Sequence, residues 1–296
     1  MLRDGFVVME TSSDRHALDL DRDGNRRSRN AVPVTVEARV VGSSVGALVG
    51  WLDGRQLKLA KIVGDGKLGN ATSWGRSVRR LCDGAASNDE RFAVGYLDND
   101  DRIWFVHGPM TKRTAATTVD DVAVTELATT TAPNWCAIAS AEDYIALFWR
   151  EGSRRFVQMC SSKECGVMGR LPLKPEHELL AAGCLRSGCL LAFRDERGKR
   201  HIGWMTPTGK PQWTKPLETN SDAVEIVGAG NKAVALSYVS PQGATVARVM
   251  AKGQIERAWA DPSLEATPAI AWSRDRLLVS WRAGSTVETT VVPMPR

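Results

Sequence analysis

The chain has 296 residues, of which 43% are apolar and 25% are charged, and its net charge is +5. This is the composition of an ordinary globular protein. It excludes a helical membrane protein, because no run approaches the roughly 18 consecutive apolar residues that a membrane helix needs. The opening "MLRDGFVVMETSSD" also lacks the apolar core of a signal peptide. Acids are interleaved with the arginine clusters, which argues against a nucleic-acid surface, so we expect no nucleic-acid partner.

A short apolar run with one large residue in a fixed slot recurs along the chain. The first copy, "GFVVMETS", places Met9 in this slot, and later slots follow at intervals of 42 to 53 residues. The longest interval contains residues 117–131, which we interpret as an insertion in a loop or an outer strand. The aromatic members of the series are Trp51, Tyr96, Trp149, Phe193, Tyr238 and Trp281.

Each copy has the same surroundings, which predict four strands, here named A to D. An apolar run (A) precedes the slot strand (B) in every copy but the first, a polar turn and an apolar strand (C) follow it, and a glycine turn leads to strand D. Only residues 174–183 have helical character. A helix-poor repeat of this length predicts an all-β, seven-bladed β-propeller with four-stranded antiparallel blades, forming a single domain over residues 1–296. The predicted turn glycines are Gly24, Gly66, Gly108, Gly166, Gly209 and Gly253.

The first and last copies are incomplete in this pattern. The chain begins at the A–B turn of the first copy and ends at the C–D turn of the last. We therefore expect the first blade to lack strand A and the last to lack strand D. An upstream stretch of about 20 residues would supply both strands, at about 5–6 residues each plus turns.

The segment "TPAIAWSRDRLLVSWRAG", residues 267–284, resembles the repeats of propellers found in secreted proteins and lipoproteins of GC-rich bacteria, myxobacteria among them. The resemblance implies a ring that serves as a binding or scaffold surface. It carries no shared catalytic residues over to this chain.

The chain has six cysteines, whose pairing indicates the cellular compartment of the protein. Cys160 and Cys165 flank a C–D turn, and Cys184 and Cys189 flank an A–B turn. Hairpin partners lie within disulfide range, so we expect the pairs Cys160–Cys165 and Cys184–Cys189. A four-thiolate zinc site and reduced thiols remain alternatives.

The remaining cysteines, Cys82 and Cys136, begin neighbouring innermost strands and are either paired or buried as thiols. Local disulfides favour an extracytoplasmic location, which is periplasmic, surface or secreted. The absent signal segment leaves the cytoplasm as the alternative.

Three motifs suggest chemistry but fit ordinary structure better. "DLDRDG", residues 19–24, opens like a calcium loop, yet Arg27 and Asn30 stand where the ninth and twelfth ligands belong. "GSSVG", residues 42–46, matches a nucleophile elbow but falls in a predicted hairpin turn. The four histidines lie in different copies without metal-ligand spacing. We expect no metal, no cofactor and no catalytic residues from these motifs.

The aromatic slots are interpreted as packing between blades rather than a ligand-stacking ring. The predicted function is a non-enzymatic binding or scaffold propeller, with a monomer favoured, that recognises a protein or a polar ligand through its B–C loops. The alternative is a hydrolase or lyase at the central channel, for which the A strands offer only Glu37, Asp83 and Glu225. The candidate binding residues are Asp53, Arg55, Asp98, Arg102, Arg150, Arg154, Arg194, Asp195 and Arg282.

Overall fold

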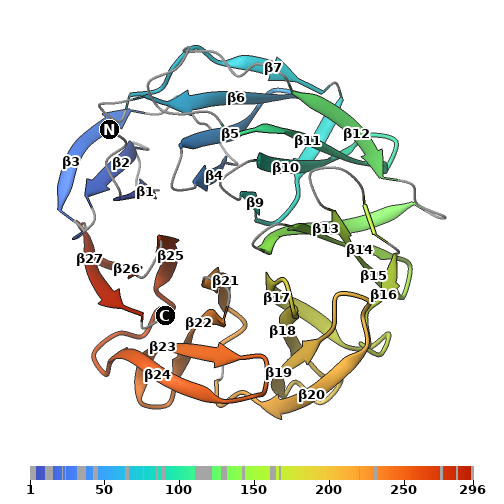
Figure 1. Ribbon diagram of the computed structural model, residues 1–296, viewed down its shortest axis with the longest axis vertical. Coiled ribbons are helices and arrows are strands. Elements are labelled where there is room, and N and C mark those ends of the chain that lie inside the picture. Colours follow the sequence, from blue (N-terminus) through green and yellow to red (C-terminus); the bar gives the residue numbers. More distant parts are fainter. Residues whose placement is uncertain are drawn as a thin grey trace. The chain divides into compact units, whose positions relative to one another are not determined.

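The strands of the computed structural model form separate antiparallel sheets, numbered here 1 to 7 in chain order (Figure 1). No helix that is long and apolar enough to cross a membrane is found among the described residues. The structure describes residues 5–10, 16–21, 23, 25–31, 38–42, 46–63, 67–75, 77–84, 86–87, 91–110, 122–127, 132–141, 144–160, 165–166, 168–219, 221–229, 232–273, 276–284 and 286–294.

The chain divides into two compact units, the first being Met1–Ile138 with Leu147–Gly152 and the second Ala139–Ala146 with Ser153–Arg296. Sheets 1 to 3 belong to the first unit. Sheet 1 comprises β1 (Gly5–Glu10), β2 (His16–Asp21) and β3 (Arg26–Ala31). Sheet 2 comprises β4 (Ala38–Gly42), β5 (Ala47–Asp53), β6 (Gln56–Ile62) and β7 (Thr72–Trp74). Sheet 3 comprises β8 (Val78–Leu81), β9 (Ala86–Ser87), β10 (Arg91–Asp98), β11 (Ile103–Pro109) and β12 (Ala123–Leu127).

Sheet 4 draws on both units, and sheets 5 to 7 belong to the second. Sheet 4 comprises β13 (Pro133–Ala141), β14 (Tyr144–Glu151), β15 (Arg154–Cys160) and β16 (Gly169–Arg170). Sheet 5 comprises β17 (Glu178–Leu185), β18 (Gly188–Arg194), β19 (Arg200–Met205) and β20 (Pro211–Pro216). Sheet 6 comprises β21 (Glu225–Ala229), β22 (Ala233–Ser240), β23 (Gly243–Met250) and β24 (Ile255–Asp261). Sheet 7 comprises β25 (Ala269–Ser273), β26 (Arg276–Ala283) and β27 (Thr286–Pro293).

Strands that are consecutive in sequence pair with each other in nearly every sheet, as Figure 1 shows. The predicted all-β class and the four-stranded antiparallel meander are confirmed by sheets 2, 4, 5 and 6. Sheet 3 adds the short β9, which also pairs with β10. Sheets 1 and 7 have three strands each within the described residues. The region around 117–131 contains β12, an outer strand that pairs with β11, while residues 117–121 and 128–131 lie outside the described residues.

The core lies between the faces of neighbouring sheets, because each sheet alone leaves an apolar face uncovered. In the first unit, Leu57 of sheet 2 belongs to the same buried cluster as Val94 of sheet 3. In the second unit, Ile202 of sheet 5 clusters with Leu236 of sheet 6. Ala235 of sheet 6 likewise clusters with Val279 of sheet 7. Adjacent copies of the repeat therefore bury each other's apolar faces.

The aromatic slots fill this core, as predicted, although not equally. The side chains of Trp51, Tyr96, Trp149 and Phe193 are buried, with Trp149 at 0% exposure. Tyr238 and Trp281 are only partly buried. The side chain of Met9 lies outside the described part of the chain.

All three cysteine pairs are disulfides. Cys160–Cys165 and Cys184–Cys189 confirm the prediction from hairpin spacing. Cys82 and Cys136 also pair, which decides the alternative that the sequence left open. The zinc and reduced-thiol alternatives are wrong, because no cysteine is free.

Among the local predictions, one turn glycine and the helical stretch are wrong, and two other turn glycines are confirmed. Gly108 lies inside β11 rather than in a turn, because β11 continues to Pro109. The expected helical character near residues 174–183 gives way to β17, whose residues pair with β18. Gly209 and Gly253 occupy turns with φ of 82° and 84°, as expected for the left-handed region. Gly24 and Gly66 lie outside the described residues.

The described residues of the two other motifs lie at the ends of paired strands. Asp21 of the calcium-like run accepts hydrogen bonds from the backbone nitrogens of Asp23 and Asn25 (2.9 and 2.8 Å), which is the hairpin turn expected. Gly42 ends β4 and pairs with Ala47 across the "GSSVG" hairpin. Residues 43–45 of that hairpin lie outside the described part of the chain.

Candidate functional site

The B–C turns that carry the candidate residues are of two kinds. In sheets 2 and 4 the turn has two residues, and Gly54 or Gly152 takes the left-handed conformation (φ 60° and 56°). In sheets 3 and 5 the turn is longer, and its left-handed position is held by Asp101 (φ 59°) or Gly198 (φ 77°). The longer turns contain internal hydrogen bonds from backbone nitrogens to an aspartate side chain.

Asp98 organises the turn of sheet 3. Its Oδ1 accepts hydrogen bonds from the backbone nitrogens of Asp100 and Arg102, both at 2.9 Å. Its Oδ2 accepts from Arg102 Nε at 3.0 Å and from Trp104 Nε1 at 2.8 Å. Burial alone would raise the pKa of Asp98, but these donors hold the pKa below its usual value. Asp98 is therefore an ionised, fully engaged structural carboxylate.

Asp195 builds the same turn in sheet 5. It accepts hydrogen bonds from the backbone nitrogens of Arg197 (2.9 Å) and Lys199 (2.8 Å). His201 Nε2 lies 2.9 Å from its Oδ2, in the place that Trp104 holds relative to Asp98. The hydrogen bond with His201 is the main reason that the pKa of Asp195 falls to about 2.

Replacing His201 with phenylalanine should raise the pKa of Asp195 from about 2 toward its ordinary value of 3.8, because the largest lowering interaction is lost. The folded-state pKa lies below the unfolded value, so ionised Asp195 stabilises the fold above pH 3.8 and this contribution is lost as the pH falls through about 2. The shift is measured by NMR titration of side-chain carboxyl carbons.

His177→Phe is the matched control, since His177 pairs with Glu196 at 3.2 Å and stacks on the same Phe193 ring as His201. An Asp195 pKa that stays near 2 in His201→Phe would contradict the assignment.

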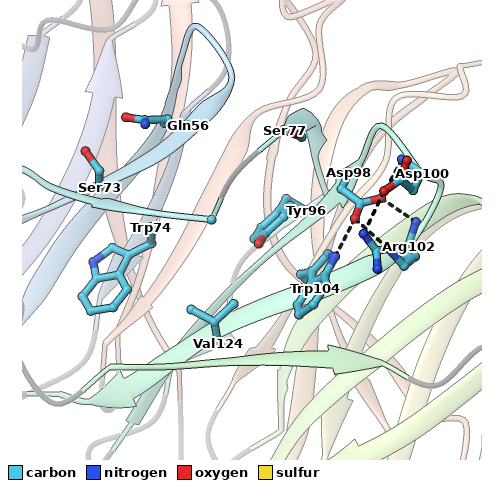
Figure 2. A pocket seen from close by; sticks show the side chains of 11 residues that line it. Gln56, Ser73, Trp74, Ser77, Tyr96, Asp98, Asp100, Arg102, Trp104 and Val124 are labelled. Atoms are coloured by element: carbon cyan, nitrogen blue, oxygen red, sulfur yellow. Dashed lines mark hydrogen bonds and ion pairs between the residues drawn. The ribbon is translucent and has the colours of Figure 1, made fainter.

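A pocket of about 540 Å³ lies in the first unit, where the end of sheet 2 meets the B–C turn of sheet 3 (Figure 2). This volume is within the range of about 300–1,000 Å³ that is usual for small-molecule sites. Trp74, Tyr96 and Trp104 supply aromatic walls, and Asp98, Asp100 and Arg102 supply charge. The other lining residues are Gln56, Ser73, Gly75, Ser77 and Val124.

Arg102 is fixed at the edge of this pocket. Its Nε binds Asp98, its Nη2 donates to Asp100 Oδ2 at 2.8 Å, and its guanidinium carbon lies 5.5 Å from the centroid of the Trp104 ring. Two carboxylates and a cation–π contact therefore hold the guanidinium of Arg102 in place. Figure 2 shows this cluster on one side of the pocket, with Trp74 on the opposite side.

The Tyr96 hydroxyl points into the space between Trp74 and Trp104 (Figure 2). Within the described part of the chain it forms no hydrogen bond. Burial, and then the charge of Asp98, raise the pKa of Tyr96 to about 12. The phenol therefore stays protonated at neutral pH and can donate a hydrogen bond to a bound molecule.

The other candidate residues are spread over separate turns. Arg150 Nε donates to Asn134 Oδ1 at 2.6 Å, and Arg282 Nε donates to the Gly284 carbonyl at 2.9 Å. Asp53 lies 4.0 Å from Lys58 Nζ. Arg55 and Arg154 are exposed at their turns.

Arg194 of sheet 5 forms ion pairs with both Glu178 and Asp222, which raise its pKa. Only Asp98 and Arg102, of the nine candidates, line the pocket.

Of the acids named for the alternative of a channel enzyme, the two that the structure describes form hydrogen bonds with different partners and are not brought together within either unit. Asp83 accepts a hydrogen bond from Trp135 Nε1 at 2.8 Å and lies 3.4 Å from Arg39. In the second unit, Glu225 accepts from the Ile270 backbone nitrogen at 2.7 Å. Its side chain reaches solvent, yet protein surrounds it closely enough for desolvation to raise its pKa. Glu37 lies outside the described residues, and no group of three or more metal-ligating side chains is found among the residues searched, which are the described ones.

Comparison with solved structures decides the fold. Virginiamycin B lyase from Staphylococcus aureus is similar over 94% of this chain and 91% of its own, with a TM-score of 0.54 and 15% sequence identity. The WD40 domain of SCAP from fission yeast matches 100% of this chain and 88% of its own, with a TM-score of 0.52 and 7% identity. The chain folds as a β-propeller.

A third propeller-like match is BBS1N, solved in complex with ARL6DN, with a TM-score of 0.57 and 11% identity over 99% of this chain and 92% of its own. No protein-family model and no curated protein sequence matches the chain. At these identities the comparisons show the fold alone. Because one neighbour is a lyase and another is a WD40 domain, the propeller fold does not choose between enzyme and binding protein.

Sequence reasoning missed most of the pocket of this propeller. It correctly placed Tyr96 in the core but did not predict that Tyr96 also lines a pocket, and it gave no role to Trp74, Trp104 or Ser77. Trp74 ends the outer strand of one sheet, and Ser77 precedes the inner strand of the next. A signal was present, because in a four-stranded antiparallel meander the link from strand D to the next strand A lies at the same edge as the B–C turn, and Trp74 stands beside that link.

Proposed function

We propose that this chain is a non-enzymatic binding protein, a single-domain propeller whose seven sheets are blades of one ring. It recognises a polar ligand or a protein through its B–C turns, with the pocket beside Asp98 and Arg102 as the recognition site. The remaining candidates lie at other B–C turns and are included in the proposed recognition surface; they are Asp53, Arg55, Arg150, Arg154, Arg194, Asp195 and Arg282.

The pocket carries this proposal. It joins a B–C turn of one sheet to the D–A link that precedes it, which is the loop face where propellers commonly bind partners. The walls combine aromatic area with fixed polar groups, a combination that suits recognition. The engaged state of Asp98 and Arg102 supports binding rather than proton transfer, because a base with all its lone pairs occupied is poorly placed to take a proton.

An extracytoplasmic location is also part of the proposal. Three disulfides in one chain support it, because they persist in oxidising compartments. Kinship with the secreted and lipoprotein propellers of GC-rich bacteria rests on the terminal repeat, residues 267–284.

Filling the pocket tests the function. Val124 is 38% exposed on β12 and faces the pocket, so Val124→Trp should block it without disturbing the core. Ile255→Trp is the matched control, since Ile255 is an aliphatic residue of 43% exposure on the outer strand β24. Ligand-observed NMR is run with a panel of glycosides, amino-acid amides, nucleosides, carboxylates, amines and short peptides.

At least one compound should bind wild type and Ile255→Trp but not Val124→Trp, and all compounds should be recovered unchanged. Binding that is equal in all three proteins, or no binding at all, would refute the pocket as the recognition site. Conversion of a compound by wild type but not by Val124→Trp would instead favour the propeller enzyme.

A further inference from the structure

We propose that the pocket between sheets 2 and 3 binds a neutral sugar ring, as a free or terminal glycan residue. This inference rests on the proposed function, since it names the ligand class of the same pocket. Its support comes from the walls, the charge balance and the unused hydrogen-bonding groups of the pocket.

The walls favour a ligand with a flat apolar face. Trp74 and Trp104 lie on opposite sides of the space into which the Tyr96 hydroxyl points (Figure 2). Aromatic rings offer large rigid contact area at low entropic cost, and the C–H face of a pyranose ring is complementary to them. A flexible aliphatic chain would gain the same apolar contact but would leave the polar groups of the pocket unpaired.

The charges disfavour an ionic ligand. Arg102 is neutralised by Asp98 and Asp100, so an anion gains no free positive partner among the described lining residues and meets Asp100, whose side chain is 73% exposed. A cation, which the aromatic walls and Asp100 would otherwise attract, meets a guanidinium already placed 5.5 Å from the Trp104 centroid. A neutral ligand avoids both penalties.

The unused polar groups match hydroxyls. Within the described part of the chain, the protonated phenol of Tyr96 and the side chains of Gln56 and Ser77 form no hydrogen bond. Gln56 offers both a donor and an acceptor, as do the two hydroxyls. A polyhydroxylated ring can satisfy such neutral groups at several positions at once, whereas a compact neutral molecule with one polar atom cannot.

The experiment removes one atom from the site. Tyr96→Phe deletes the phenol oxygen, which forms no hydrogen bond with any residue that the structure describes, so folding stability should not change. Tyr238→Phe is the matched control, because Tyr238 occupies the same slot of sheet 6 and lies outside the pocket. Binding of the methyl glycosides of glucose, galactose, mannose, xylose and N-acetylglucosamine is titrated by saturation-transfer NMR up to 50 mM, beside tetramethylammonium chloride, sodium phosphate and cyclohexane-methanol.

At least one glycoside should bind wild type and Tyr238→Phe equally, bind Tyr96→Phe about two- to ten-fold more weakly, as expected for one lost hydrogen bond, and not bind Val124→Trp. Three outcomes overturn the sugar: no glycoside binds, a glycoside binds with unchanged affinity in Tyr96→Phe and Val124→Trp, or only tetramethylammonium, phosphate or the alcohol binds in a Val124-sensitive manner. The last outcome leaves the proposed binding function standing. A complete lack of Val124-sensitive binding, in this panel and in the broader one, defeats both.

Discussion

Replacing Cys82 and Cys136 together by alanine should lower the free energy of unfolding by about 4 kcal/mol, if the bond acts by restricting the unfolded chain. The disulfide spans 54 residues of sequence and joins the end of β8 to β13, so it closes by far the longest of the three loops. Both sulfurs lie in the core, with side-chain exposures of 1% and 2%, and alanine leaves no buried polar group behind. Urea unfolding followed by circular dichroism measures the change.

Cys184→Ala with Cys189→Ala is the control, because that bond spans only 5 residues. The same entropic relation gives about 2 kcal/mol for it. Equal losses in the two double variants would show that the bonds stabilise through contacts of the folded state rather than through loop closure.

Trp149→Ala should destabilise the protein by about 3–5 kcal/mol, the range for truncating a large buried aromatic side chain. Trp149 has 0% exposure, and its Nε1 donates to Glu151 Oε1 at 2.7 Å, so the variant creates both a cavity and a disturbed buried carboxylate. Trp149→Phe keeps a ring in the slot and should recover part of the loss. Thermal and urea unfolding of the purified variants give the values.

Trp281→Ala is the comparison within the repeat. Trp281 holds the same slot in sheet 7 but is only partly buried and packs beside Trp259, with ring centroids 5.3 Å apart. Its truncation should cost clearly less than that of Trp149. A larger loss of unfolding free energy in Trp281→Ala than in Trp149→Ala would mean that burial of the slot residue does not determine how much it stabilises the fold.

The fold could be predicted because the sequence repeat indicates which residues pack between neighbouring sheets. A slot that returns in successive copies must serve the same neighbour-to-neighbour contact, and the buried clusters shared by sheets 2 and 3 and by sheets 5 and 6 are that contact. Local exceptions came from tertiary pairing. Gly108 suggested a turn, yet Phe92 of β10 pairs with it and β11 runs on.

The site was only partly predictable, because charge neutralisation is a three-dimensional property. Arg194 looks available in sequence, but its partners Glu178 and Asp222 lie 16 and 28 residues away. Asp98 likewise reads as a surface acid, although its turn and Trp104 consume its acceptors. The position of the turns could be read from the pattern, whereas the wall that Trp74 adds depends on two sheets meeting.

The Cys82–Cys136 bond also has a mechanical consequence. If the two ends of the chain were pulled apart, the sheets outside the bond would extend as they came undone, but the 54-residue segment within it would be bypassed by the force. At about 3.5 Å per residue, roughly 190 Å of length would stay hidden until a reductant cut the link. Most of sheet 3, with the turn that holds Asp98 and Arg102, sits inside this shielded stretch, whereas Trp74 and Ser77 precede Cys82, so tension would pull one wall of the pocket away before it could extend that turn.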